Sequence, residues 1–186
     1  MAQAGPLDAR AAGLANRLCG NAPGTTLIES TLNGPTFTAL RDVVVGAAGR
    51  GFVLHVDGEP AGQRTTRIRT GQTLALKATG EGVRGYLAIA GGIEAEPFLG
   101  STSVDRYGLI GRALRAGDVL GIADEDTRPH EMQARAQEIP YHVVIRLHRG
   151  PQWSNQAEEA LTSAPFTVAT GDRMGVRLEG PEVPGG

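Results

Sequence analysis

The chain has 186 residues, of which 40% are hydrophobic and 20% charged, so it can form one globular domain or one domain with part of another. Its formal net charge is −2, and no run of Lys or Arg is present, which argues against nucleic acid or an anionic membrane as a partner. Glycine is common at 27 residues and aromatic residues make up only 4%, which favours short strands joined by tight turns.

Cys19 is the only cysteine, which excludes an intramolecular disulfide and a zinc site made of several thiolates. The first ten residues lack the basic start and apolar core of a signal peptide. No apolar stretch is long enough to cross a bilayer. We therefore expect a cytoplasmic protein.

The first predicted element is a helix near the start of the chain. Apolar residues recur there at helical spacing and fall on one face. They are Leu7, Ala11, Leu14, Ala15 and Leu18. Asp8 is placed to cap this helix and Gly20 to end it.

After the helix, the pattern changes to that of short strands. The segments are apolar or alternating and are separated by Gly, Pro, Asn and Asp. They cover residues 26–32, 43–48, 52–56, 73–78 and 86–90. Residues 69–74 and 115–120 resemble each other, because in both a turn that contains a glycine leads into an apolar run. Each predicts a hairpin-type turn at the entry to a strand. The expected fold class is therefore mainly β with a few short helices.

The stretch from residue 124 to residue 138 is polar, contains Pro129, and predicts a linker. We expect one subdomain over residues 1–125 and the start of an incomplete second subdomain over residues 139–186. In this second part, the predicted strands cover residues 141–147, 166–170 and 176–178, and a helix follows Asn155, with Glu158 at the capping-box position. Because the second part has so few elements, the edges of its sheet stay open. We therefore expect a chain that is cut short or depends on a partner.

Residues 80–85 have the GxGxxG spacing of a dinucleotide fingerprint, which requires a helix after the turn. A strand pattern follows instead, so we interpret the segment as a hairpin turn and reject nicotinamide binding.

The histidines are His55, His130, His142 and His148. They have no tight metal-ligand spacing, so we interpret them as surface or structural residues and propose no metal site.

Four polar residues lie where the helix leads into the first strand: Asp8, Asn16, Asn21 and Glu29. Asp8 and Asn16 are about 80° apart around the helix axis, so both could line one cleft. The alternative interpretation makes Asp8 a helix cap, Asn21 a turn residue and Glu29 a solvent-facing strand residue.

Residues 100–106 combine hydroxyl groups, a carboxylate and a guanidinium in one loop. Ser101 and Arg106 suit a polar or anionic ligand, although Ser and Asp can equally satisfy backbone groups of a turn. Asp172 and Arg173 occupy a similar polar turn, where they could form a surface pair. Trp153 is interpreted as a core anchor or an interface residue.

A series of motifs occurs in order along nearly the whole chain. They cover residues 5–8 (GPLD), 15–16 (AN), 18–21 (LCGN), 28–29 (IE), 34–35 (GP), 84–92 (RGYLAIAGG), 99–103 (LGSTS), 111–112 (GR), 117–118 (GD), 146–152 and 171–181. In this order they resemble the family of the C-type 5-oxoprolinase subunit and the urea carboxylase carboxyltransferase domain, which includes the antagonist of a sporulation-kinase inhibitor. Cys19 replaces a usual valine, and the family continues well beyond residue 181.

The resemblance implies cyclophilin-like β-barrel subdomains and a subunit of an ATP-dependent 5-oxoprolinase. Such a subunit would act with B-type and A-type subunits to convert 5-oxo-L-proline to L-glutamate, with ATP used by the assembled complex, and would be inactive alone. We expect Asp8, Asn16, Asn21, Glu29, Ser101 and Arg106 to bind the small amide or lactam substrate, and assign no catalytic residue. Two alternatives remain: a urea-type carboxyltransferase component that works with biotin, and a non-catalytic regulatory module that binds a B-type partner.

Overall fold

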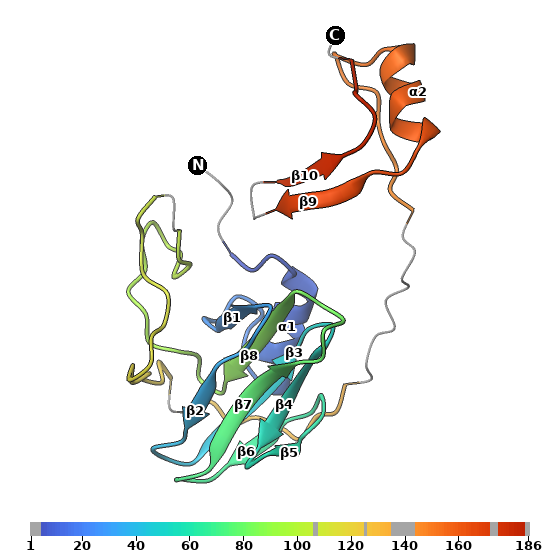
Figure 1. Ribbon diagram of the computed structural model, residues 1–186. Coiled ribbons are helices and arrows are strands. Elements are labelled where there is room, and N and C mark those ends of the chain that lie inside the picture. Colours follow the sequence, from blue (N-terminus) through green and yellow to red (C-terminus); the bar gives the residue numbers. More distant parts are fainter. Residues whose placement is uncertain (1–4, 106–107, 125, 135–143, 172–174, 185–186) are drawn as a thin grey trace. The chain divides into compact units, whose positions relative to one another are not determined.

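The computed structural model describes residues 5–105, 108–124, 126–134, 144–171 and 175–184 (Figure 1). The chain divides into two compact units, which over the described residues are residues 5–134 and residues 144–184, and each is described by itself. The described residues contain two short helices and three antiparallel sheets, which confirms the mainly β class. Within these residues, no helix is long and apolar enough to span a membrane.

The first unit opens with helix α1, Ala9–Leu18. Asp8 is its N-cap, and the Oδ1 atom of Asp8 accepts hydrogen bonds from the backbone N–H groups of Arg10 (3.1 Å) and Ala11 (3.0 Å). Gly20 follows the helix with φ of 74°, a conformation that glycine adopts without steric cost. The predicted helix, its cap and its end are confirmed.

Eight strands of the first unit form two antiparallel sheets. They are β1 (Ile28–Thr31), β2 (Thr36–Thr38), β3 (Val43–Ala48), β4 (Phe52–Val56), β5 (Glu59–Pro60), β6 (Thr66–Ile68), β7 (Thr73–Ala78) and β8 (Arg84–Ile89). One sheet has the order β1-β8-β3-β6 and the other β2-β7-β4-β5. Over the described residues neither sheet closes on itself, because the chain passes from one to the other through connections rather than ladder hydrogen bonds. The expected closed barrel is therefore not seen.

The hydrophobic core lies between these two sheets. Its fully buried side chains come from both of them and include Val45, Leu54, Ile68, Leu76 and Leu87. Burial of such side chains supplies most of the driving force for this packing.

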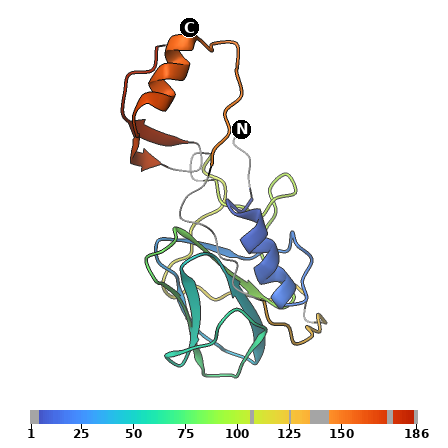
Figure 2. The same ribbon diagram turned by 90° about the vertical axis from the view of Figure 1, so that its right-hand side faces the viewer.

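Helix α1 covers the other face of the sheet that contains β8 and β3 (Figures 1 and 2). Ala12 and Ala15 of the helix pack there against Tyr86 and Ala88 of β8. Strand β8 is therefore buried on both faces, which explains why residues 86–90 form a continuous apolar run rather than an alternating one.

The five predicted strands of the first unit are all present, whereas the predicted hairpin at residues 80–85 is wrong. Strands β7 and β8 belong to different sheets, so this connection crosses between sheets. The glycine turn at Gly71 (φ 85°) leads into β7, but it is not a hairpin turn, because β6 and β7 belong to different sheets. No strand follows Gly117 (φ 91°) within the described part of that loop. The segment after β8 has isolated bridges, such as Ile93 with Ile122, in place of a ladder.

The second unit contains helix α2 (Asn155–Ser163) and a two-stranded antiparallel sheet of β9 (Thr167–Gly171) and β10 (Val176–Glu179). A capping box that ends at Glu158 places the N-cap at Asn155, whereas the observed N-cap is Ser154, one residue earlier. Its Oγ accepts a hydrogen bond from the N–H of Ala157 at 3.0 Å. The helix and both strands after it are confirmed.

Two other predictions for this unit have different outcomes. Residues 144–147 are not in a strand, because they have no ladder partner among the described residues, and residues 141–143 lie outside them. Glu158 does not complete a capping box. Its Oε2 instead accepts hydrogen bonds from Trp153 Nε1 (3.2 Å) and Arg149 Nη2 (3.0 Å), and Trp153 is only half-buried.

Candidate functional site

A cluster of polar side chains lies where the N-terminal segment meets strands β1 and β8. We call it the Glu29 cluster. It consists of Asp8, Glu29, Thr31, Arg84 and Tyr86. The register of β1 against β8 pairs Glu29 with Tyr86 and Thr31 with Arg84. Residues two apart on a strand, and residues directly opposite each other, share one face of a sheet, so these four side chains lie together.

Both carboxylate oxygens of Glu29 accept hydrogen bonds. Oε2 accepts from the hydroxyl of Tyr86 (2.9 Å) and from the backbone N–H of Leu7 (2.8 Å). Oε1 lies 3.3 Å from Nη1 of Arg84, which also contacts the hydroxyl of Thr31. Glu29 is thus not a free solvent-facing carboxylate but the centre of a bonded network.

The Tyr86 hydroxyl links this network to the start of α1. Its side chain is fully buried, and its oxygen accepts a hydrogen bond from the N–H of Asp8 at 2.7 Å while it donates to Glu29. Burial, together with the nearby Glu29 charge, raises the pKa of the Tyr86 phenol well above its ordinary value. The hydroxyl therefore keeps its proton and remains a donor to the carboxylate.

Asp8 is half-buried, and its two carboxylate oxygens have different surroundings. Oδ1 caps helix α1. Among the described residues, Oδ2 has no hydrogen-bond partner, so one charged acceptor remains for another group.

Asn16 belongs to a second polar cluster, near the end of α1. It is fully buried. Both amide hydrogens are used, since Nδ2 donates to the carbonyl oxygens of Pro23 (3.2 Å) and Thr25 (2.9 Å). Its Oδ1 accepts a hydrogen bond from Asn21 Nδ2 at 3.1 Å. Asn16 therefore fixes the loop that connects the helix to β1.

Asn21 ties the same loop to the end of β8. Its Nδ2 also donates to the carbonyl oxygen of Ile89 (2.8 Å), and its Oδ1 accepts from the N–H of Gly91 (2.9 Å). The Asn21 side chain thus joins the end of α1 to residues 89–91, which lie about seventy residues further along the chain, in keeping with the turn interpretation of Asn21.

The structure brings Asp8 and Glu29 together, and Asn16 and Asn21 together, but not all four. Asp8 and Asn16 are eight residues apart, which places them about 12 Å apart along the helix axis. Within the described residues, no hydrogen bond joins the two clusters. Their assignment as one substrate-binding set stays a prediction.

The loop that follows β8 contains the remaining predicted site residues. Ser101 Oγ accepts a hydrogen bond from the N–H of Ser103 (3.2 Å), which is a local turn contact. Thr102 joins the loop to Thr26 through their hydroxyl groups, at 3.0 Å. Arg106 lies outside the described residues. The described contacts show the turn role of Ser101, and its role in substrate binding stays a prediction.

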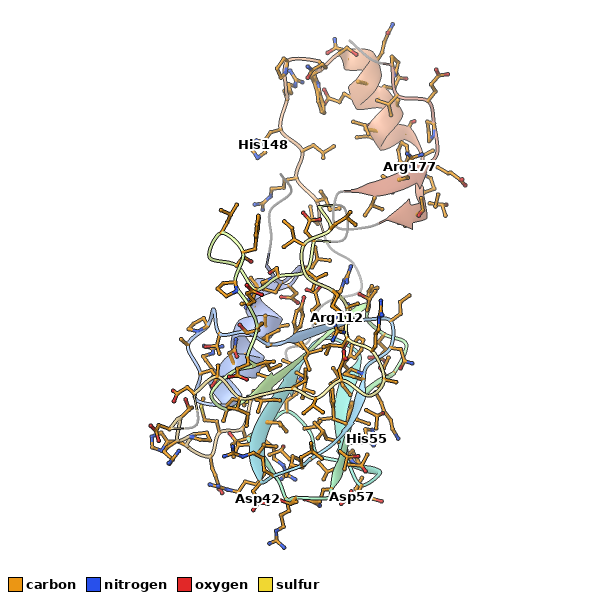
Figure 3. All side chains as sticks on the ribbon, turned by 90° about the vertical axis from the view of Figure 1, so that its left-hand side faces the viewer. Asp42, His55, Asp57, Arg112, His148 and Arg177 are labelled. Carbon is orange, nitrogen blue, oxygen red and sulfur yellow. The ribbon has the colours of Figure 1, made fainter. Side chains whose placement is uncertain are left out.

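Other carboxylates of the first unit serve as turn anchors. Hydrogen bonds from Thr70 lower the pKa of Asp42, and hydrogen bonds from Thr73 and Gln72 lower the pKa of Asp57. Figure 3 shows both carboxylates at the same end of the unit. In the loop after β8, a bidentate contact of Arg112 (2.6 and 2.9 Å) and the N–H of Arg115 lower the pKa of Asp118 to about 2.

Among the described residues, no group of three His, Cys, Asp or Glu side chains is arranged to hold a metal ion. His55 instead lies 2.8 Å from the carbonyl oxygen of Gly58, through its Nδ1, in a turn. His130 and His148 are exposed, and His148 is labelled in Figure 3. The predicted residues His142, Asp172 and Arg173 lie outside the described residues.

Sequence reasoning missed three members of the Glu29 cluster as site residues: Thr31, Arg84 and Tyr86. The missing information was the register of β1 against β8, which joins segments more than fifty residues apart. The one available signal was polar side chains two residues apart on each segment, Glu29 with Thr31 and Arg84 with Tyr86.

Comparison with known proteins supplies a family for this chain. The model of the carboxyltransferase domain, subdomain A and B, matches residues 1–185. The C-type 5-oxoprolinase subunit of Escherichia coli (strain K12) is 33% identical in an alignment 186 residues long, which covers 95% of this chain and 59% of that protein. The urea amidolyase of Saccharomyces cerevisiae is 29% identical in an alignment 199 residues long, which covers 96% of this chain and 11% of that protein.

Solved structures agree with this result. The crystal structure of TTHA0988 in space group P6522 has a TM-score of 0.91 and 49% sequence identity, and the match covers all of this chain and 71% of that one. The Kluyveromyces lactis urea amidolyase has a TM-score of 0.78 and 25% identity over 99% of this chain and 12% of its own. The chain thus spans about three fifths of the matched 5-oxoprolinase subunit and about a tenth of the matched urea amidolyases.

Proposed function

The chain belongs to the carboxyltransferase domain family, subdomains A and B, and on this premise we propose that it is a component of an ATP-dependent 5-oxoprolinase. In this role it acts with B-type and A-type subunits in the ATP-driven conversion of 5-oxo-L-proline to L-glutamate. It contributes to the binding of the lactam and is inactive without its partners.

The observation that carries this proposal is the similarity to the C-type 5-oxoprolinase subunit, at 33% identity over 95% of this chain. That relative is a separate subunit, and this chain covers 59% of it. The urea amidolyases are similarly related, but the matched region is about a tenth of each, so it is one part of a much longer protein. Relation to a separate subunit favours function in a complex of several chains.

The Glu29 cluster suits a role in binding and orientation. It offers the Asp8 carboxylate on a framework held by Tyr86 and Glu29. A carboxylate oxygen accepts a hydrogen bond from an amide or lactam N–H, and orientation of a bound substrate is a major source of rate enhancement.

ATP contact is assigned to no residue of this chain. The glycine-rich segment 80–85 is followed by strand β8 rather than by a helix N-terminus, and Gly82 packs against the backbone of Arg50, so it does not form a phosphate cradle. We therefore place ATP use in the assembled complex.

The cyclophilin-like barrel is part of the same proposal. Strand β3 leads into β4 through three residues, and the two strands belong to facing sheets. This short crossing, together with that from β7 to β8, supports the interpretation of the two sheets as the two sides of one barrel-like subdomain.

A second candidate is a urea-type carboxyltransferase component. It is supported by the similarity to the urea amidolyases of S. cerevisiae and K. lactis, and it would require carboxybiotin from separate proteins. A third candidate is a regulatory module, in which the chain binds a B-type partner but the complex catalyses no reaction.

One co-purification experiment separates the three functions. The 186-residue chain is purified with a B-type subunit from the same source, and 5-oxoproline-dependent ATP hydrolysis is measured with and without the A-type subunit. Turnover only in the three-component mixture is the expected result. A stable complex without turnover points to the regulatory module, and carboxylation of urea in the presence of a biotin carrier and biotin carboxylase points to the carboxyltransferase component.

A further inference from the structure

The segment that precedes helix α1 is attached to the sheet by side chains. The N–H of Leu7 donates to Glu29 Oε2 at 2.8 Å, and the N–H of Asp8 donates to the Tyr86 hydroxyl at 2.7 Å. The two acceptors are themselves joined by the 2.9 Å bond from Tyr86 to Glu29. Consecutive backbone amides are therefore held by one connected pair of side chains.

This pair has a fixed position in the fold. Tyr86 is fully buried, and it packs against Ala12 and Ala15 of α1. Glu29 lies directly opposite Tyr86 on the neighbouring strand and is further held by Arg84. The backbone position of Asp8 is thus determined by the packing of β1, β8 and α1.

Asp8 presents its unpaired oxygen from this fixed position. Its Oδ1 is used by the first turn of α1, whereas Oδ2 has no partner among the described residues. Glu29 differs, since both of its oxygens are already bonded within the protein. Within the Glu29 cluster, Asp8 is therefore suited to contact a ligand N–H, and Glu29 is suited to hold Asp8.

We propose that Tyr86 and Glu29 are positioning residues, which hold the Asp8 carboxylate where it accepts a hydrogen bond from the N–H of an amide or lactam ligand. This inference rests on the proposed function for the class of ligand. The first proposed function involves a lactam and the alternative involves urea, and both molecules carry an amide N–H.

The positioning role is tested by amide hydrogen exchange of the full 186-residue chain, measured by NMR. Tyr86→Phe removes the hydroxyl and keeps the buried ring. We expect exchange at Asp8 to become at least about tenfold faster, because its N–H loses the Tyr86 hydroxyl as acceptor, and exchange at Leu7 to become faster as well, because its acceptor Glu29 loses the bond from Tyr86. Unchanged exchange at both amides would overturn the proposal.

Thr65→Val is the matched control for this measurement. It removes a hydroxyl at the other end of α1, where Thr65 Oγ1 donates to the carbonyl oxygen of Leu18 at 2.7 Å. Exchange at Leu7 and Asp8 should be the same in this variant and in the wild type. If Tyr86→Phe fails to fold, Glu29→Gln replaces it, and faster exchange is then expected at Leu7, because the glutamine keeps the shape of the side chain but its neutral oxygen is a weaker acceptor for that N–H.

The ligand role of Asp8 is tested by NMR titration of the same chain with 5-oxoproline and, separately, with urea. We expect one probe to shift the amide signals of Asp8 and Arg10. Asp8→Ser, which still caps the helix, should abolish these shifts, and Tyr86→Phe should raise the apparent Kd about tenfold. No shift with either probe, or an equal Kd in Tyr86→Phe and the wild type, overturns the proposal.

The same titration separates this inference from the proposed function. If 5-oxoproline binds at Asp8 but the assembled complex shows no turnover, the positioning role is supported and the oxoprolinase function fails. Binding of urea alone also supports the positioning role and transfers the function to the carboxyltransferase alternative.

Discussion

At the scale of single residues, burial determines the chemistry of Cys19. Its side chain is fully buried between α1 and the sheet, and its thiol lies 3.3 Å from the carbonyl oxygen of Ala88. Burial raises the pKa of this thiol from 9.0 to about 12, because the thiolate cannot be solvated there. Cys19 therefore behaves as a small core residue and not as a nucleophile.

The raised pKa predicts that the protein loses stability in alkaline solution. Between pH 9 and 12 the unfolded chain releases the thiol proton while the folded chain keeps it, so the free energy of unfolding falls as pH rises. From about pH 8 to about pH 10, the wild type should lose about 1 kcal/mol more than Cys19→Val. Urea denaturation at both pH values measures the difference. Tyr86 is present in both proteins, so its own titration cancels, and equal losses would contradict the prediction.

Individual site residues were predicted from sequence only where their role is local. The capping role of Asp8 follows from its place before a helical run, and the turn role of Asn21 from its place after one. The hydroxyl of Tyr86 was not predicted, because its partners Glu29 and Asp8 lie 57 and 78 residues away in the sequence. Such contacts are visible only once the register of β1 against β8 is known.

At the scale of elements, the close approach of α1 to β3 depends on Gly46. A Cβ at this position would lie 2.6 Å from the Cβ of Leu18 and 2.7 Å from the carbonyl oxygen of Ala15. Gly13, within α1, has no such neighbour among the described residues, since a Cβ there would meet nothing within 4 Å. The two glycines therefore allow the contact and the helix propensity to be tested separately.

Gly46→Ala should destabilise the protein by about 2 kcal/mol, because the helix must shift away from the sheet. Gly13→Ala should stabilise it by up to about 1 kcal/mol, because alanine has the higher helix propensity and fits without a clash. Thermal denaturation of the two variants and the wild type measures both effects. A Gly46→Ala variant as stable as the wild type would show that α1 does not pack on β3 as closely as described.

The sequence patterns predicted the elements in which apolar residues recur at a clear helical or strand spacing, and they missed the shortest strands. Strands β2, β5 and β6 have two or three residues each, which is too short for alternation to be recognised. The hairpin predicted at residues 80–85 failed for another reason. A turn signal shows that the chain bends but not whether the next strand joins the same sheet, and β8 joins the opposite one because its neighbours are β1 and β3.

At the scale of the whole molecule, the two units differ in how much apolar surface they bury. The first unit has two sheets and a helix around its cores. In the second unit, every residue of β9 and β10 that the structure describes is exposed, and Val168, Val176 and Leu178 each retain more than half of their surface. A single two-stranded hairpin is marginally stable in water, so the second unit has much less to hold it together.

This difference predicts unequal protection from hydrogen exchange. Amides of β9 and β10 should exchange close to the rate of an unfolded chain, whereas amides of β3 and β8, which lie inside a four-stranded sheet, should be protected by the full stability of the first unit. Mass spectrometry of peptides from the intact chain measures both regions in one experiment. If the partner of the proposed function covers the exposed valines and leucine, its addition should slow exchange in β9 and β10 alone. Strong protection of the hairpin in the isolated chain would instead show that its apolar surface is already covered.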